Sequence, residues 1–255
     1  MNIPRALLLV GLSFVAPLAR TAEQVSVAAA ANLVYALESL NAEFKRLHPD
    51  TTLTSASGAS GSLFAQIKNG APFDVFLSAD TDYPRELVAQ NLGDPASFRI
   101  FATGRLVLWT TRPSLDPSDP AAVARNTDVK RIALAQPRTA PYGRAAQAAL
   151  EKLGVWTAVQ PRLVIGENIT QTAQFVETGN ADAGFVALSI VLSPRLAGKG
   201  RWSEVAPDLY AGVPLDHAGV LTLRGAKNPA AQRYLDFLAS EPAKKILRDF
   251  GYGTP

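Results

Sequence analysis

Short apolar runs alternate along this chain with longer segments in which apolar residues recur every three or four positions. The runs are QVSVAAA, TTLTSAS, FDVFLSA, RLVLWTT, RIALAQ, RLVIGE and AGFVALS. Runs of this length predict strands, and the period of the intervening segments is that of amphipathic helices. Because strands that alternate with helices form sheets with crossover connections, the sequence predicts an α/β fold.

The expected helices have recognisable ends. The first runs from about Asn32 to His48 and stops before Pro49, which cannot continue it. Its apolar stripe consists of Leu33, Leu37, Leu40, Phe44 and Leu47. Further helices are expected to end near Gly70, Gly154 and Gly179, and two more to begin after Asn228 and Ser240.

The N-terminus predicts a secretory signal peptide over residues 1–22. Arg5 precedes an apolar run from Ala6 to Ala19, which is too short to span a bilayer. No later apolar run is long enough either, so we expect an exported chain without membrane insertion. The formal charge of +3 includes Arg5 and Arg20, so the mature chain would be nearly neutral and gives no basis for nucleic-acid binding. The sequence has no cysteine, which excludes thiolate chemistry.

Two stretches interrupt the alternating pattern. They are Ala102 to Arg105 and the segment DLYAGVPLDHAG, from Asp208 to Gly219. If both cross between two lobes, the first lobe is discontinuous. The expected division places residues 23–103 and 214–255 in the first lobe and residues 104–213 in the second.

Four expected junctions between a strand and a helix share one chemistry. They are AAAANL, SGASGS, QPRTAPYGR and GENITQ, which are rich in small, amide or hydroxyl residues. Ligands of open α/β sheets bind at such junctions, and the unpaired amides and dipole of a helix start favour an anion. Ser60 and Asn32 would add side-chain donors, while Gly58 and Gly61 allow a tight turn. The other reading of each junction is an ordinary helix cap.

Other chemistries fit less well. GASGS, residues 58–62, is close to the nucleophile elbow Gly-x-Ser-x-Gly, so a hydrolase using Ser60, Asp182 and His217 is an alternative. His217 is its one plausible base and is read more simply as a structural histidine. Carboxylates are scattered singly, and no Gly-x-Gly-x-x-Gly opens a helix. We therefore expect no enzyme, no metal-ion site and no cofactor.

Longer segments carry a resemblance to a known family. They are AAAANL, SGASGSLFAQIKNGAPFDVFLSAD, ATGRLVLW, APYGRAAQAALEKLG, NITQTAQFVETGNADAGFVALS and YLDFLASEPAKKILRDFGY. The chain thereby resembles the periplasmic molybdate-binding proteins, which deliver an oxyanion to an ABC importer. The resemblance implies a type II periplasmic binding fold, with two doubly wound lobes joined by two crossing segments. It also implies a periplasmic monomer that holds molybdate or tungstate between the lobes and meets a membrane permease.

The resemblance also implies which residues hold the oxyanion. Asn32 and Ser60 would contribute from the first lobe, the backbone amides of Tyr142 and Ile169 from the second, and Ala31 its N–H. They would bind molybdenum as the oxyanion, not as a bare cation. Whether Tyr142 gives its phenol or only its amide stays open, as does the alternative of a receptor for sulfate or another tetrahedral oxyanion.

Three further positions bear on the site. Ala187 stands where many relatives have a tyrosine, so that phenol donor is missing. We expect Glu167 to face solvent and to offer the ligand no acceptor. Arg144, two residues beyond Tyr142, is expected to point along its helix into solvent.

Overall fold

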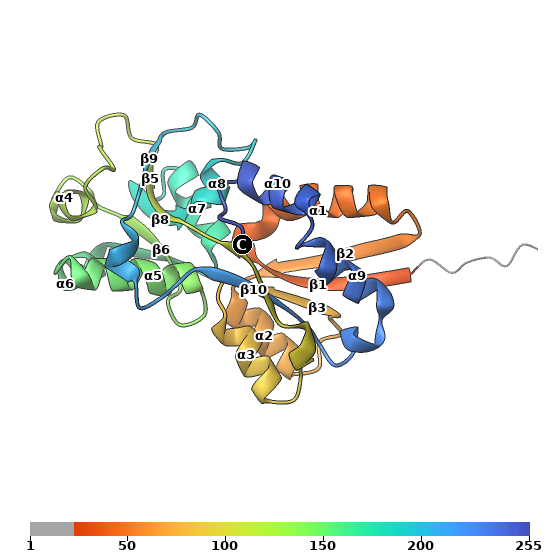
Figure 1. The fold of residues 1–255 in the computed structure, drawn as a ribbon. Coiled ribbons are helices and arrows are strands. Elements are labelled where there is room, and N and C mark those ends of the chain that lie inside the picture. The colour runs from red at the N-terminus through yellow and green to blue at the C-terminus, as the bar shows by residue number, and fades with distance from the viewer. Residues whose placement is uncertain (1–22) are drawn as a thin grey trace, which may run out of the picture.

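The computed structural model describes residues 23–255, which contain two five-stranded sheets covered by helices (Figure 1). The predicted signal peptide lies outside the described residues. The first sheet has the strand order β2 (Thr51–Gly58), β1 (Glu23–Ala30), β3 (Val75–Ser78), β10 (Asp216–Leu221), β4 (Arg99–Thr103). The second has the order β7 (Leu163–Gly166), β6 (Ile132–Ala135), β8 (Ala183–Ala187), β5 (Leu106–Thr110), β9 (Arg201–Glu204).

The two sheets are built alike. In the first, β1 runs parallel to β2 and β3, while β10 is antiparallel to β3 and β4. In the second, β6 runs parallel to β7 and β8, while β5 is antiparallel to β8 and β9. Strands such as β5 and β8 are buried at every residue, which explains their continuous apolar sequence. The predicted α/β fold and the strands expected from the apolar runs are confirmed.

Three strands were not predicted. β4, β9 and β10 have mixed or polar sequences, RIFAT, RWSE and DHAGVL. β4 and β9 lie at sheet edges, where an outward-facing polar side chain costs nothing. The expected crossing segments were therefore too long, since Ala102 and Thr103 belong to β4 and Asp216 to Gly219 belong to β10.

Six of the ten α-helices among the described residues were predicted from the sequence, and the other four were not. Their bounds are α1 (Val34–Leu47), α2 (Ser60–Lys68), α3 (Asp82–Ala89), α4 (Pro120–Arg125), α5 (Pro141–Lys152), α6 (Trp156–Val159), α7 (Ile169–Glu177), α8 (Leu188–Val191), α9 (Pro229–Phe237) and α10 (Glu241–Asp249). A short 3₁₀ turn, η1 (Ala31–Leu33), leads into α1. Gly154 and Gly179 follow α5 and α7 with φ of +67° and +75°, a conformation that glycine adopts without steric cost.

The elements group into two lobes. The first sheet with α1, α2, α3, α9 and α10 forms the first lobe, and the second sheet with α4 to α8 forms the second. In Figure 1 the blue C-terminal helices accordingly lie with the orange N-terminal elements, while the green and cyan elements form the other half. In the first lobe the buried Phe44 ring of α1 packs against Tyr234 and Phe237 of α9. No helix among residues 23–255 has the length and apolarity needed to cross a membrane.

Candidate functional site

The four junctions singled out in the sequence meet between the lobes. They follow β1, β2, β6 and β7 and lead into η1, α2, α5 and α7. Together they line a small cavity of about 10 Å³. Its walls are formed by Ala30, Ala31, Asn32, Gly58, Ala59, Ser60, Ala79, Ala140, Pro141, Tyr142 and Ile169. All of these residues are uncharged, and all five residues expected at the site are among them.

Three of the four junctions lack a side-chain cap. The N-cap positions of η1, α2 and α5 are Ala30, Ala59 and Ala140, and none of them caps its helix through a side chain. Pro141 has no N–H, so Tyr142 carries the first amide of α5. Because the first-turn amides of a helix have no partner within the helix, these starts supply donors at the cavity wall. Capping thus fails as an explanation for three junctions.

The fourth junction is capped, but not completely. The Asn168 side chain accepts hydrogen bonds from the amides of Thr170 and Gln171, at 3.0 and 3.1 Å. The Ile169 amide precedes both of these and makes no hydrogen bond to the Asn168 side chain. Ile169 itself lines the cavity and is buried.

Ser60 lies inside the first turn of α2 rather than at its N-cap. Its Oγ accepts a hydrogen bond from the Ala79 amide at 3.0 Å, and its side chain is buried. The bond to Ala79 uses an acceptor position of Oγ, so the hydroxyl hydrogen remains available for donation.

Asn32 is held by side-chain and main-chain bonds. Its Nδ2 lies 2.6 Å from His217 Nε2 and donates to Tyr252 Oη at 2.7 Å. Its carbonyl accepts from the hydroxyls of Tyr252 and Ser189, at 2.9 and 3.0 Å. In this arrangement both hydrogens of Nδ2 are directed to His217 and Tyr252. Among the described residues, Asn32 Oδ1 is one of two buried side-chain polar atoms without a hydrogen-bond partner.

The other such atom is the phenol oxygen of Tyr142. Burial raises the pKa of Tyr142 well above its usual value, so the phenol keeps its hydrogen. A side chain at Gly104, in the first crossing segment, would collide with this oxygen and with His217. Glycine at position 104 thus allows the phenol to approach the main chain where the chain passes between the lobes.

The residues of the hydrolase alternative do not form a triad. His217 uses Nε2 for Asn32 and lies with Nδ1 2.9 Å from the Leu215 carbonyl, which leaves no nitrogen for Ser60. Asp182 pairs with Arg112 at 2.9 Å and accepts from two backbone amides of its own lobe.

Hydrogen bonds across the cavity hold the lobes together. Thr170 Oγ1 donates to the Ala31 carbonyl, and the Gly61 amide donates to the Thr139 carbonyl, both at 2.9 Å. With the bond from Ser189 to Asn32, these contacts join both lobes around the cavity, so the structure is in a closed state.

A partly buried ion pair joins the two lobes. Asp80, just beyond β3 in the first lobe, pairs with Arg144 of α5 in the second. The Arg144 guanidinium also lies over the Tyr83 ring, 5.3 Å from its centroid, and donates to the Tyr83 hydroxyl at 3.2 Å. The expectation that Arg144 points into solvent was therefore wrong. Burial raises the pKa of Asp80, although the Ser78 hydroxyl and Arg144 oppose that rise. Asp80, Arg144 and Tyr83 are called the clasp below.

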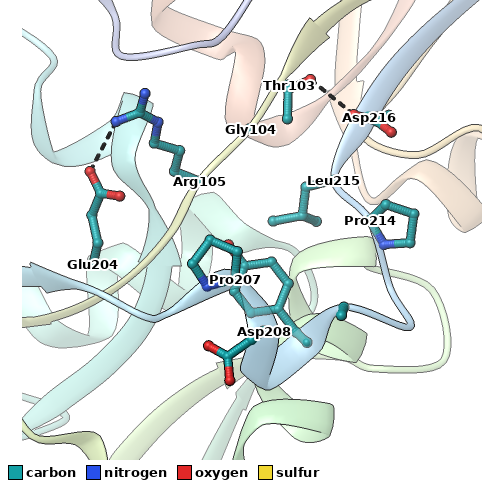
Figure 2. Close-up of a pocket in the computed structure, with 11 residues that line it drawn as sticks. Thr103, Gly104, Arg105, Glu204, Pro207, Asp208, Pro214, Leu215 and Asp216 are labelled. Atoms are coloured by element: carbon teal, nitrogen blue, oxygen red, sulfur yellow. Dashed lines mark hydrogen bonds and ion pairs between the residues drawn. The ribbon is translucent and has the colours of Figure 1, made fainter.

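A larger pocket of about 680 Å³ lies elsewhere, between the two segments that cross from lobe to lobe (Figure 2). Its carboxylates already have partners in the protein. Arg105 donates to Glu204 at 3.1 Å and Thr103 to Asp216 at 2.9 Å, as Figure 2 shows, and Lys152 lies 3.4 Å from Asp208. Size alone favours this pocket, but the uncapped helix starts and Asn32, with its unpaired Oδ1, are at the smaller cavity.

The surroundings fit a site that binds through neutral groups. Glu167 is exposed and lines the outer cleft rather than the cavity, as expected. Ala187 is buried and is not part of the cavity wall. Within residues 23–255, no group of three or more His, Cys, Asp and Glu side chains is placed to hold a metal ion.

Comparisons with known proteins find relatives over nearly the whole chain. The family described as "Bacterial extracellular solute-binding protein" matches residues 25–253. The molybdate-binding protein of Rhodobacter capsulatus is 41% identical over 91% of this chain and 89% of its own length. That of Azotobacter vinelandii is 38% identical over 99% of this chain and 98% of its own length. The solved structure of the periplasmic molybdate-binding protein of Azotobacter vinelandii superimposes with a TM-score of 0.85, covering 91% of this chain and 99% of that one at 31% identity.

The burial of His217 predicts a pH dependence of stability. Burial lowers the pKa of His217 from 6.5 to about 4, while the Leu215 carbonyl and Asp216 oppose the shift. Because the unfolded chain binds this proton more readily, the stabilisation is fully present above about pH 6.5 and is lost as the pH falls toward 4.

We expect His217 to account for a loss of about 2 kcal/mol in the free energy of unfolding between about pH 7 and about pH 4.5. Denaturant unfolding of the wild type and of His217→Gln at both pH values isolates this contribution, since the carboxylates are common to both proteins. An equal loss in both proteins would contradict the assignment.

Proposed function

The chain belongs to the bacterial extracellular solute-binding proteins, and from that premise we propose that it binds molybdate in the cavity between its lobes. The observation that carries the proposal is the convergence of uncapped helix starts on a small cavity with an uncharged wall. Helix starts favour an anion through their amides and dipoles, without a neighbouring cation. The names of the relatives in Rhodobacter and Azotobacter supply the identity of the anion.

The proposed ligand contacts come from both lobes. Ser60 would donate its hydroxyl hydrogen and Asn32 its side-chain amide, each with the backbone N–H. Ala31, Tyr142 and Ile169 would contribute their backbone amides. Each group bonds an oxygen of the ligand, so no residue is a ligand of the molybdenum atom itself. The position of the Tyr142 phenol beside Gly104 favours a role for its amide rather than its hydroxyl.

Binding would proceed by closure of the lobes. An oxyanion held by the helix starts of one lobe draws the amides of the other onto its remaining oxygens. The clasp and the bonds from Thr170 and Gly61 form only when the lobes meet, so they stabilise the closed state. We assign residues 23–103 and 214–255 to the first lobe and residues 104–213 to the second, which agrees with the membership of the two sheets.

The cellular role follows from the family. We propose that the chain is exported by a signal peptide over residues 1–22 and acts as a monomer in the periplasm. There it would deliver its ligand to the permease of an ABC importer. Tungstate, which nearly matches molybdate in size and charge, is expected to bind as well.

A receptor for sulfate or another tetrahedral oxyanion is the second candidate, because neutral donors around a small cavity suit any such anion. Calorimetric titration of the protein with molybdate, repeated in excess sulfate, separates the two. We expect tight binding of one molybdate per chain that persists in sulfate. Binding that sulfate abolishes would favour the general receptor, and a protein that binds neither anion would contradict both.

Ser60→Ala should weaken molybdate binding by about tenfold or more, because a hydrogen bond to a charged group is worth about 1.5 to 3 kcal/mol. Ser62→Ala is the matched control, since Ser62 lies in the same helix and outside the cavity wall. Titration of both variants measures the difference. Equal affinities would remove Ser60 from the site.

Arg144→Gln should accelerate molybdate release by about tenfold and leave the association rate nearly unchanged, because the pair with Asp80 forms only after the lobes meet. Stopped-flow fluorescence can measure both rates. Arg99→Gln is the control, because Arg99 pairs with Asp236 within the first lobe. A slower association with unchanged release would mean that the clasp does not act on the closed state.

A further inference from the structure

His217 is a buried histidine that the proposed contacts do not use. It is fully buried on β10 and does not line the cavity, but its Nε2 is 2.6 Å from Asn32 Nδ2. The rings of Phe101, Tyr142 and Tyr252 surround it, with centroids 6.1, 6.1 and 5.3 Å away. The Asn32 side chain therefore links the imidazole to the cavity through a hydrogen bond.

The hydrogen bonds of His217 determine where its proton lies. The Leu215 carbonyl can only accept, so the Nδ1 that lies 2.9 Å from it must carry a hydrogen. In a neutral imidazole Nε2 is then an acceptor, and the Asn32 amide must turn its Nδ2 toward it. Tyr252 Oη takes the second hydrogen of the same Nδ2. The neutral histidine thus accounts for the unpartnered Oδ1 of Asn32.

This arrangement does not suit an oxyanion. An amide oxygen at the cavity wall repels the oxygens of an anion, whereas Nδ2 would attract them. Half a turn of the Asn32 amide would exchange the two atoms and bring Oδ1 to His217 and Tyr252. His217 could then bond Oδ1 only through a hydrogen on Nε2. Because Nδ1 keeps its hydrogen for Leu215, the imidazole would become a cation.

We propose that oxyanion binding is coupled to the uptake of one proton by His217, which turns the Asn32 amide so that Nδ2 donates to the ligand. The proton comes from solvent and forms a bond to Nε2, and no other bond is made or broken. His217 is a positioning residue in this scheme, since it acts on the ligand through Asn32. The inference rests on the proposed function, because it needs an oxyanion in the cavity.

The charges around His217 agree with this coupling. Burial lowers the pKa of His217 to about 4, so the ring is neutral at neutral pH. A dianion one side chain away would favour the imidazolium, as opposite charges at such separations do. The groups that face the ring are Asn32 of η1, Phe101 of β4, Tyr142 of α5 and Tyr252 near the C-terminus. Asp216, next to it on β10, also favours the cation.

Calorimetric titration with molybdate in buffers of different ionisation enthalpy measures the protons taken up per ligand. We use the exported chain without its predicted signal peptide, above about pH 6, where molybdate binds no proton of its own. We expect an uptake that approaches one proton per ligand at the acidic end of this range and declines as the pH rises. The affinity should fall by up to tenfold per pH unit over the range in which a proton is taken up.

Two variants assign the proton. His217→Gln offers Asn32 Oδ1 a neutral donor, so it should bind molybdate without proton uptake and with an affinity that changes little with pH. His48→Gln, which replaces the only other histidine, should take up the proton as the wild type does. Uptake that persists in His217→Gln would place the proton on another group, such as Asp80, and would overturn the inference.

Wild-type binding separates this inference from the proposed function. Molybdate binding without proton uptake would refute the coupling and leave the function intact, whereas the absence of any binding would refute the function. Should His217→Gln fail to fold, nitrogen chemical shifts of the remaining imidazole in His48→Gln provide a second measurement. We expect one protonated nitrogen without ligand and two with it; unchanged shifts would refute the coupling.

Discussion

The first amides of a helix have no partner within the helix, and the site of this protein is built on that constraint. η1, α2 and α5 begin after Ala30, Ala59 and Ala140, whose side chains have no oxygen to cap them. Water can satisfy these amides while the lobes are apart. Once the lobes close, these helix starts face one small cavity, so the amides of several helices must share one occupant. A small oxyanion has several acceptor oxygens and can accept a hydrogen bond from each of these amides. A wall without charged side chains can therefore hold an anion.

The charged residues Asp80 and Arg144 lie in the cleft but do not line the cavity. Because they pair with each other, together they add little net electric field at the cavity. The proposed function thereby separates two tasks: neutral donors would recognise the anion, and the ion pair would hold the lobes together. The second layer behind Asn32 works differently, because His217 and Tyr252 contact its side chain and Ser189 donates to its main-chain carbonyl. Recognition therefore depends on the direction of hydrogen atoms more than on formal charge.

Much of the fold and the site could be predicted from the sequence, because local patterns reflect local physics. The stripe from Leu33 to Leu47 gave α1, and small residues after strands marked the junctions that meet at the cavity. β4, β9 and β10 were missed because edge position and antiparallel pairing relax the apolar pattern on which a strand prediction depends. The partner of Arg144 and the direction of the Asn32 amide were missed for another reason. Both depend on residues far away in the chain, Asp80, His217 and Tyr252, and no local spacing encodes such contacts.

The position of β10 has a consequence for the order in which the protein can assemble. The strand lies between β3 and β4 in the first sheet, although it follows the whole second lobe in the chain. All strands of the second sheet lie between Leu106 and Glu204, so that sheet can be completed from one continuous segment. The first sheet cannot, because its fourth position stays empty until residues 216–221 arrive. A chain that emerges with its N-terminus first would therefore complete the second lobe before the first. The closure of the site would then be among the last steps of folding.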